Sequence, residues 1–289
     1  MIPLWLTLTV ISAFSLATSD VLTKKALAGH NEYLVSWLRL LPSLPVFLIP
    51  LVFLPAPPLH PDFFLCVFGA LPLEALAVIL YTKALKLSPL NLTLPLLSLT
   101  PLLLLVVPFL ILGERISPLG AAGIVLIAAG GYLLNARPGQ RVGLLPVRAL
   151  LCEKGSLCML CVAAIYSITA TLGKRAIAAS SPLFFAACYI PLLVLLISPV
   201  ALYKGRGELR LMAQNGTIRA SALPALFYVI QVITHVYAIN LTNVAYMIAV
   251  KRLSLLFGVL YGRYLFQEKG GVIATLIMLA GVSLIVIGG

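Results

Sequence analysis

The chain has 289 residues, of which 62% are hydrophobic and only 10% carry a charge. A soluble globular domain is about a quarter charged, so this composition excludes a soluble protein and predicts an integral membrane protein. A net charge of +12 would suggest nucleic-acid binding in a soluble chain, but here we assign it to the loops on one side of a membrane and expect no nucleic-acid partner. The five cysteines are scattered and no histidine lies near a cysteine or another histidine in sequence, so we expect neither metal nor cofactor.

Hydropathy and helix-breaking residues divide the chain into ten apolar segments with short connections. The predicted membrane-spanning helices are Ile2–Leu22, Tyr33–Leu54, Phe63–Leu85, Leu90–Leu112, Pro118–Leu134, Gly155–Ile177, Pro182–Leu202, Ile218–Asn240, Asn243–Phe266 and Gly271–Gly289. The predicted fold class is therefore an all-α integral membrane protein with ten transmembrane helices.

The two halves of the chain resemble each other. Short sequences recur at corresponding places, namely Leu22-Thr-Lys-Lys-Ala26 with Leu172-Gly-Lys-Arg-Ala176, and Phe109-Leu-Ile-Leu-Gly-Glu114-Arg115 with Tyr264-Leu-Phe-Gln-Glu268-Lys269. Because each half has an odd number of spans, the second copy must begin on the opposite side of the membrane, which makes an inverted repeat. We expect a first five-helix repeat at 1–136, a connecting loop at 137–154 and a second five-helix repeat at 155–289.

Small residues follow two stripes. Ser12, Ser15 and Ser19 recur at helical spacing in the first span, beside Asp20, and we interpret them as hydrogen-bond donors to a neighbouring helix. The fifth and tenth spans are rich in Gly and Ala, which allows helices to approach closely. Packing inside the chain explains these glycines, and a homodimer contact is the alternative.

The distribution of Lys and Arg predicts the orientation. With the N-terminus outside, the outer loops hold only Arg115, Lys174 and Arg175, and the other loop cations are cytoplasmic. Arg39 can reach the same cytoplasmic side by snorkelling. The positive-inside rule therefore predicts both termini outside a plasma membrane that the chain crosses many times.

Lys251 and Arg252 are adjacent cations near the middle of the ninth span. At about 1.5 Å per residue, Lys251 lies roughly 12 Å in from Asn243, close to the bilayer midplane. A charge at that depth costs about 2.5 kcal/mol or more, so it needs compensation. The pair is either a buried ion pair between helices or an anion-binding site in a water-filled cavity, and we favour the anion site because few acids are available nearby.

Five other polar residues are candidates for the same site. Glu74, in the third span, would neutralise Lys251 or Arg252, or alternatively would carry a coupling proton. Gln231 and His235 lie one turn apart and face the same way, either into a cavity or into an interhelical hydrogen bond. Tyr81 and Tyr246 would line the pathway or lie at interfaces.

The sequence resembles the drug/metabolite transporter superfamily, specifically the EamA type. The resemblance rests on Leu-Gly-Glu114-Arg115-Ile-Ser-Pro-Leu-Gly with its following Gly/Ala-rich span, and on Leu-Phe-Gln-Glu268-Lys269 before a second such span. It covers essentially the whole chain and implies a ten-helix alternating-access transporter. Characterised members generally have both termini in the cytoplasm, whereas the charge distribution here predicts the reverse. Lys251-Arg252 is also similar to the Lys-Arg pair that contacts phosphate in plastid sugar-phosphate translocators.

From these observations we expect a secondary transporter of a small metabolite with a phosphate or carboxylate group. The substrate-binding candidates are Lys251, Arg252, Glu74, His235, Gln231, Tyr81 and Tyr246. One alternative is a flippase for a lipid-linked phosphate such as a polyprenyl carrier. A membrane-embedded enzyme acting on a phosphorylated lipid is a second alternative, but such enzymes usually cluster acids or histidines, whereas the eight acids here are dispersed.

Overall fold

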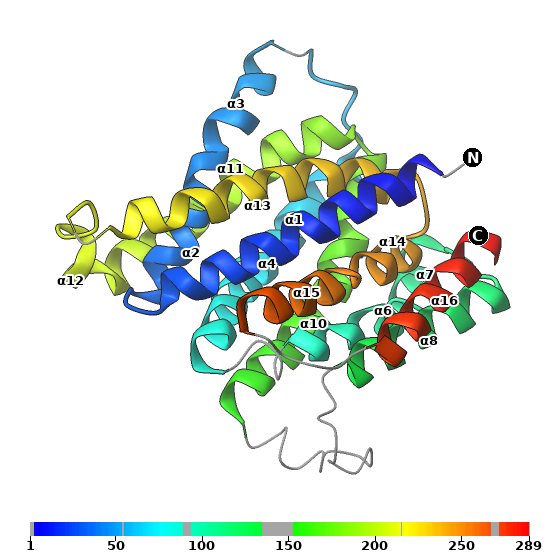
Figure 1. Cartoon of the computed structure of the whole chain (residues 1–289). Helices are drawn as coiled ribbons and strands as arrows, with labels where there is room; N and C mark the ends of the chain where they lie inside the picture. The colour runs from blue at the N-terminus through cyan, green and yellow to red at the C-terminus, as the bar shows by residue number, and fades with distance from the viewer. Residues whose placement is uncertain are drawn as a thin grey trace.

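The computed structural model of the chain is a bundle of helices (Figure 1). It describes residues 3–53, 55–88, 94–134, 153–214, 216–266 and 272–288, and no strand occurs in these ranges. Most of the predicted connecting loop at 137–154 lies outside the described residues, as do Glu268 and Lys269 of the second repeat motif.

Each of the ten predicted segments overlaps helical structure. In chain order the helices are α1 (Leu4–Leu27), α2 (Glu32–Leu40), η1 (Leu41–Ser43), α3 (Leu44–Phe53), α4 (Pro61–Leu87), η2 (Leu94–Ser98), α6 (Leu99–Leu103), α7 (Val107–Leu112), α8 (Pro118–Leu133), α10 (Lys154–Ala178), α11 (Pro182–Lys204), α12 (Arg206–Leu209), α13 (Thr217–Asn240), α14 (Val244–Lys251), α15 (Ser254–Phe266) and α16 (Val272–Gly288).

Six of the helical stretches within the described ranges are long and apolar enough to cross a membrane. They are Leu4–Leu27, Glu32–Phe53, Pro61–Leu87, Lys154–Ala178, Pro182–Lys204 and Thr217–Asn240. Leu96–Leu112, Pro118–Leu133 and Ile273–Gly288 are shorter apolar helices. The prediction of an all-helical, multi-pass membrane protein is therefore confirmed for the described part of the chain.

Side-chain caps start several helices directly after short connections. The Oδ1 of Asn31 accepts a hydrogen bond from the backbone N of Tyr33 at 2.9 Å, where α2 begins. Ser117 accepts from the N of Gly120 at 3.0 Å, with Pro118 at the first position of α8. Such caps satisfy backbone N–H groups that have no partner within the helix.

Three of the segments are interrupted rather than continuous. The 3₁₀ turn η1 joins α2 to α3 and contains Pro42. A turn at 104–106 separates α6 from α7, just before Pro108. These two breaks follow from proline, which lacks the N–H that a helix needs. The third break separates α14 from α15 at Arg252 and Leu253 and has no proline.

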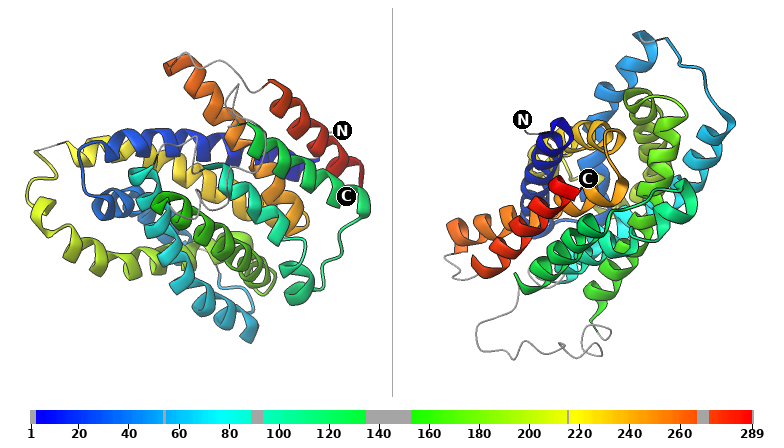
Figure 2. Two further views of the ribbon diagram at one scale, coloured as in Figure 1. Left: turned by 90° about the horizontal axis from the view of Figure 1, so that it is seen from below. Right: turned by 90° about the vertical axis from the view of Figure 1, so that its right-hand side faces the viewer.

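The helices pair across the two halves of the chain. Figures 1 and 2 show α1 alongside α13, and α8 alongside α16. The helices α4 and α10 form a third pair whose packing is equally extensive. The Oγ of Ser19 donates to the backbone O of Pro224 at 2.8 Å, and the Oγ of Ser12 donates to the backbone O of Gln231 at 3.3 Å. The structural interpretation is confirmed for these two serines, which bond α1 to α13.

Glycines bring α8 and α16 into backbone contact. A Cβ on Gly123 would lie 2.6 Å from the carbonyl O of Gly281, and a Cβ on Gly281 would lie 2.7 Å from that of Gly123. Only glycine permits this approach, as expected for small residues between membrane helices. Packing inside the chain therefore explains these two glycines, while the homodimer stays an untested prediction.

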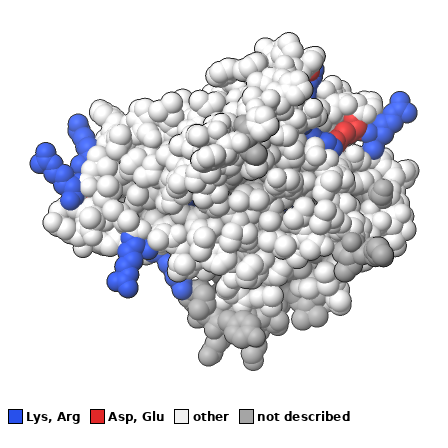
Figure 3. Space-filling view, turned by 90° about the horizontal axis from the view of Figure 1, so that it is seen from above, with Lys and Arg blue, Asp and Glu red and all other residues white. Residues whose placement is uncertain are grey.

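Charged side chains gather at the two ends of the bundle. On the face seen in Figure 3, Lys and Arg lie at the end that carries α12 with no acidic side chain visible beside them, and mixed charges lie at the opposite end, although Glu208 of α12 also belongs to the first end. At that opposite end Arg175 pairs with Asp62 at 2.8 Å, and Lys174 pairs with Glu114. The first residues of α1 and the last residues of α16 also lie at this end (Figures 1 and 2).

Candidate functional site

A cavity of about 190 Å³ lies among α1, α2, α4, α10, α11, α13 and α14. Its wall is mainly apolar and aromatic. Six of the seven predicted site residues line it, namely Glu74, Tyr81, Gln231, His235, Lys251 and Arg252. Their shared position agrees with helical periodicity, because Glu74 and Tyr81 are two turns apart on α4 and Gln231 and His235 are one turn apart on α13. That these residues bind a substrate stays a prediction.

Lys251 and Arg252 face the cavity from a broken helix instead of the continuous one that we expected. Lys251 is the last residue of α14, and α15 begins only at Ser254. The backbone N of Arg252 donates to the O of Ala249 at 2.9 Å, and the N of Leu253 donates to the O of Val250 at 2.9 Å, so the helix tightens here before it ends. Neighbours in a regular helix diverge by about 100°, and this turn lets both cations line one cavity.

Both cations are buried and neither is paired with an acid. Lys251 is 8% exposed and Arg252 is 4% exposed. Among the described residues, no carboxylate oxygen lies within 4.0 Å of either side chain. Lys251 instead contacts His235, with 3.0 Å between Nζ and Nδ1. An ammonium group only donates, so a charged Lys251 requires Nδ1 of His235 to accept.

Arg252 has unused hydrogen-bonding capacity. Its Nε is buried and has no hydrogen-bond partner among the described residues. A guanidinium carries five N–H donors in a planar fork, which matches a carboxylate or phosphate. This unused donor is compatible with an anion-binding role, which stays a prediction.

Glu74 lines the cavity but does not form the predicted ion pair with Lys251 or Arg252. The ion pairs within the described part of the chain do not include it, and its near neighbour is the hydroxyl of Thr169 on α10. Glu74 lines the cavity from α4 and Lys251 from the end of α14, and their charged atoms are more than 4.0 Å apart.

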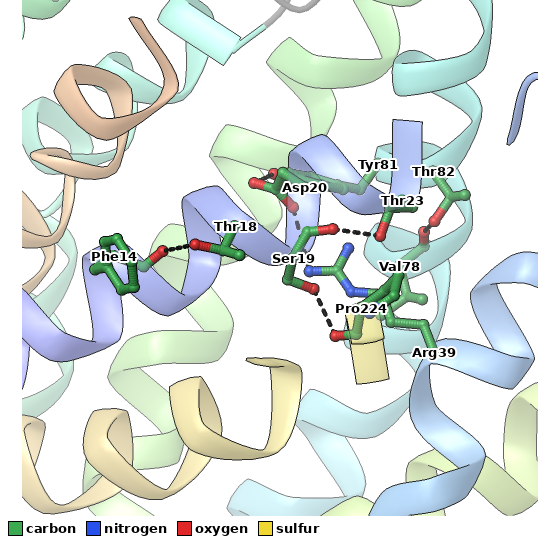
Figure 4. Close-up of polar contacts among 10 residues, drawn as sticks. All are labelled: Phe14, Thr18, Ser19, Asp20, Thr23, Arg39, Val78, Tyr81, Thr82 and Pro224. Carbon is green, nitrogen blue, oxygen red and sulfur yellow. Dashed lines mark hydrogen bonds and ion pairs between the residues drawn. The ribbon is translucent and has the colours of Figure 1, made fainter. Parts of the chain in front are cut away.

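A second buried charge cluster contains a cation that the sequence analysis misplaced. Arg39 does not snorkel to the cytoplasmic surface: it is 7% exposed and lines the cavity. Its Nη2 lies 3.2 Å from Oδ1 of Asp20, and the hydroxyl of Tyr81 donates to Oδ2 of Asp20 at 2.6 Å (Figure 4). The guanidinium also lies over the ring of Tyr228, 5.4 Å from its centroid. Asp20 thus has both carboxylate oxygens engaged.

The comparisons with known proteins agree with this fold. Residues 3–136 match the model of the EamA-like transporter family. The matched residues make up just under half of the chain and correspond to the predicted first repeat. Over 97% of this chain, the fold is similar to that of a protein of known crystal structure, with a TM-score of 0.72, 16% identity and 96% of that protein covered. No curated protein matches the sequence.

The match over residues 3–136 indicates a membrane transporter of small molecules, as the members of the EamA-like family are. The predicted relationship to the drug/metabolite transporter superfamily is confirmed. Within the described residues, no group of three or more His, Cys, Asp or Glu side chains is arranged to hold a metal ion.

Tyr246 is the one predicted site residue that does not line the cavity of this EamA-like protein. Its hydroxyl accepts a hydrogen bond from the backbone N of Ser117 at 3.1 Å, and its ring lies against Gly120 of α8. Tyr246 and Lys251 are five positions apart, which separates them by about 140° around α14. Tyr246 therefore faces α8 while Lys251 faces the cavity.

Three further tyrosines line the cavity and were not among the predicted site residues. They are Tyr166, Tyr189 and Tyr228. Tyr189 stacks on Phe185, with 4.9 Å between ring centroids, and Tyr166 packs at 6.4 Å from Tyr81. The signal available in the sequence was weak, because tyrosines are also common at membrane interfaces.

Proposed function

We propose that the protein is a secondary transporter of small molecules that carry a phosphate or carboxylate group, and that Lys251 and Arg252 bind this group. The observation that carries the proposal is the burial of two adjacent cations beside a cavity, with no carboxylate within 4.0 Å of either among the described residues. A buried charge without a partner costs several kcal/mol. A bound anion would remove that cost, with Arg252 providing a planar fork and Lys251 a point charge.

The cavity limits the size of the substrate. Its volume of about 190 Å³ is below the roughly 300–1,000 Å³ of pockets for drug-sized ligands, so the substrate is a small metabolite. The apolar and aromatic wall would enclose its body, and Gln231 and His235 would orient its polar groups. Tyr81 would have a structural role instead, because its hydroxyl donates to Asp20 and this bond supports the cavity wall.

We also propose that residues 1–136 and 155–289 are inverted repeats that move against each other to expose the cavity alternately on each side. The helix pairing supports this, because α1 with α13 and α10 with α4 are equivalent pairs once the halves are exchanged. Two matching hydrogen bonds, made by lysines near the C-terminal ends of α1 and α10, support the repeat further. Nζ of Lys24 donates to the O of Ser88 at 2.8 Å, and Nζ of Lys174, the matching residue of the second half, donates to the O of Thr242 at 2.8 Å.

From the distribution of Lys and Arg, we propose that both termini lie outside the plasma membrane.

Thermal stabilisation of the purified protein by ligands tests the binding role of Lys251 and Arg252. A ligand that binds the folded state raises stability by mass action, by about 2.7 kcal/mol at a hundred times its Kd. We expect phosphorylated metabolites or dicarboxylates to stabilise the wild type, and neutral sugars and organic cations not to do so. Lys251→Ala and Arg252→Ala should each abolish the effect.

Arg175→Ala is the matched control, because it removes a cation that lies at the end of the bundle and is paired with Asp62. It should keep the wild-type response. Stabilisation by anions that persists in both cavity variants would refute the proposed site. Stabilisation by a polyprenyl phosphate alone would instead favour the lipid flippase.

A further inference from the structure

Glu74 is an acid in the cavity wall, and the proposed binding of an anion by Lys251 and Arg252 does not require it. It is partly accessible from the cavity, and it forms no ion pair within 4.0 Å among the described residues, although Arg39, Lys251 and Arg252 line the same cavity. Asp20, the other acid of this region, is 3% exposed and bonded through both oxygens. Glu74 is therefore the acid whose charge can change without breaking an ion pair.

The charges around the cavity show when protonation of Glu74 is needed. Three cations (Arg39, Lys251, Arg252) face two acids (Asp20, Glu74), so the empty site has a net charge of 3 − 2 = +1 when all five are ionised. His235 counts as neutral, because its Nδ1 contacts the ammonium of Lys251. A bound monoanion brings the total to zero. A bound dianion brings it to −1, and a net buried charge is strongly unfavourable in a membrane interior.

We propose that Glu74 is a proton-binding site that couples transport to a proton: a dianionic group enters together with one proton, and Glu74 carries that proton. This inference rests on the proposed function, because it concerns the anion bound by Lys251 and Arg252. The proton is taken from water on the side where the substrate enters and is released on the other side. A monoanion crosses without it. The transporter therefore accepts a dianion only together with a proton, because the site, the dianion and the proton then have a net charge of zero.

The neighbourhood of Glu74 supports this assignment over the other titratable groups. The hydroxyl of Thr169 lies beside its carboxyl, where it can donate to the ionised form and, by rotating, accept from the protonated form. His235 is the nearest rival, but its Nδ1 is occupied by Lys251. The titratable and charged groups that face the cavity around Glu74 are Asp20 behind Arg39, Arg39 itself, Tyr81, Tyr166, Tyr189, Tyr228, His235, Lys251 and Arg252.

Proton uptake measured on anion binding tests the proposal. The full-length protein in weakly buffered detergent is mixed with sulfate, which stays a dianion, or with methyl sulfate, which stays a monoanion, and the pH change is read with an indicator dye. The wild type should take up about one proton per sulfate and none per methyl sulfate. The apparent Kd for sulfate should rise by as much as tenfold per pH unit on the alkaline side, the limit for uptake of one proton.

Glu74→Gln keeps the shape of the protonated side chain and removes the titration, so it should bind sulfate without proton uptake and without the pH dependence. His235→Asn should retain the proton uptake. Uptake that persists in Glu74→Gln, or that disappears only in His235→Asn, overturns the assignment to Glu74. Sulfate binding by the wild type without any proton uptake overturns the coupling itself but leaves the proposed anion transport intact.

A pH titration of the protein without anion separates the two proposals. Infrared spectroscopy detects the C=O stretch of a protonated carboxyl group, and the band that differs between wild type and Glu74→Gln reports on Glu74. If that band titrates but neither sulfate, phosphate nor a dicarboxylate stabilises the protein, the proposed function fails. If no such band appears between about pH 5 and pH 9 when the titration is repeated with saturating sulfate, the proton site fails.

Discussion

Arg39 in α2 and Arg252 at the end of α14 line the same cavity, but only Arg39 has a carboxylate partner. Its guanidinium lies 3.2 Å from Asp20, which is held in turn by Tyr81. No carboxylate lies within 4.0 Å of Arg252 among the described residues, and because the Nε atoms of both arginines lack a hydrogen-bond partner there, the carboxylate is what distinguishes the two. The charge of Arg39 is therefore balanced within the wall, whereas the Lys251–Arg252 cluster has no carboxylate of its own, and we propose that a bound anion completes it.

The largest effect on stability should come from unpairing Arg39. Asp20→Asn leaves a buried guanidinium without its counter-charge, and breaking a buried pair in this way costs about 3–5 kcal/mol. Thermal unfolding in detergent should show the loss. The double variant Asp20→Asn/Arg39→Gln should recover much of it, because no unpaired charge remains. Wild-type stability of Asp20→Asn would mean that the Arg39 cluster does not depend on the ion pair.

Arg252→Met should have the opposite consequence. It removes a buried charge that has no carboxylate partner and keeps a side chain of similar length, so we expect stability without ligand to be unchanged or to rise by up to about 2 kcal/mol. The same thermal measurement without added anion checks this. A loss of several kcal/mol would show that Arg252 already has a stabilising role in the empty protein, and the contrast with Arg39 would disappear.

An exposed pair should have the smallest effect. Arg175 and Asp62 form an ion pair whose side chains are 43% and 31% exposed. Exposed pairs contribute about 0–1 kcal/mol, so Arg175→Ala should change the free energy of unfolding by less than about 1 kcal/mol, and added salt should reduce the difference further. A cost equal to that of Asp20→Asn would mean that burial is not what distinguishes the two pairs.

The sequence was a good guide wherever one segment contains the relevant pattern. Apolar length located the helices, and helical periodicity put Gln231 and His235 on one face toward the cavity. Ser12 and Ser19 of the serine stripe were correctly interpreted, because such hydroxyls have few alternatives to a neighbouring helix.

The features that the sequence did not predict depend on how helices rotate and meet. Asp20 and Arg39 belong to different helices, and their pairing depends on how α1 packs against α2. The break between α14 and α15 has no proline or glycine at residues 249–254 to mark it. Glu74 and Lys251 do not form the expected ion pair because they belong to different helices around a cavity whose presence no single segment reveals.

The most direct test of the central claim is to locate a bound anion. Crystals of the wild type grown or soaked with selenate would give an anomalous selenium signal wherever a tetrahedral dianion binds. We predict a peak in the cavity, within hydrogen-bonding distance of Lys251 Nζ and the guanidinium of Arg252, and no such peak in Arg252→Met. Peaks confined to the charged ends of the bundle, with the cavity empty at the same selenate concentration, would contradict the account.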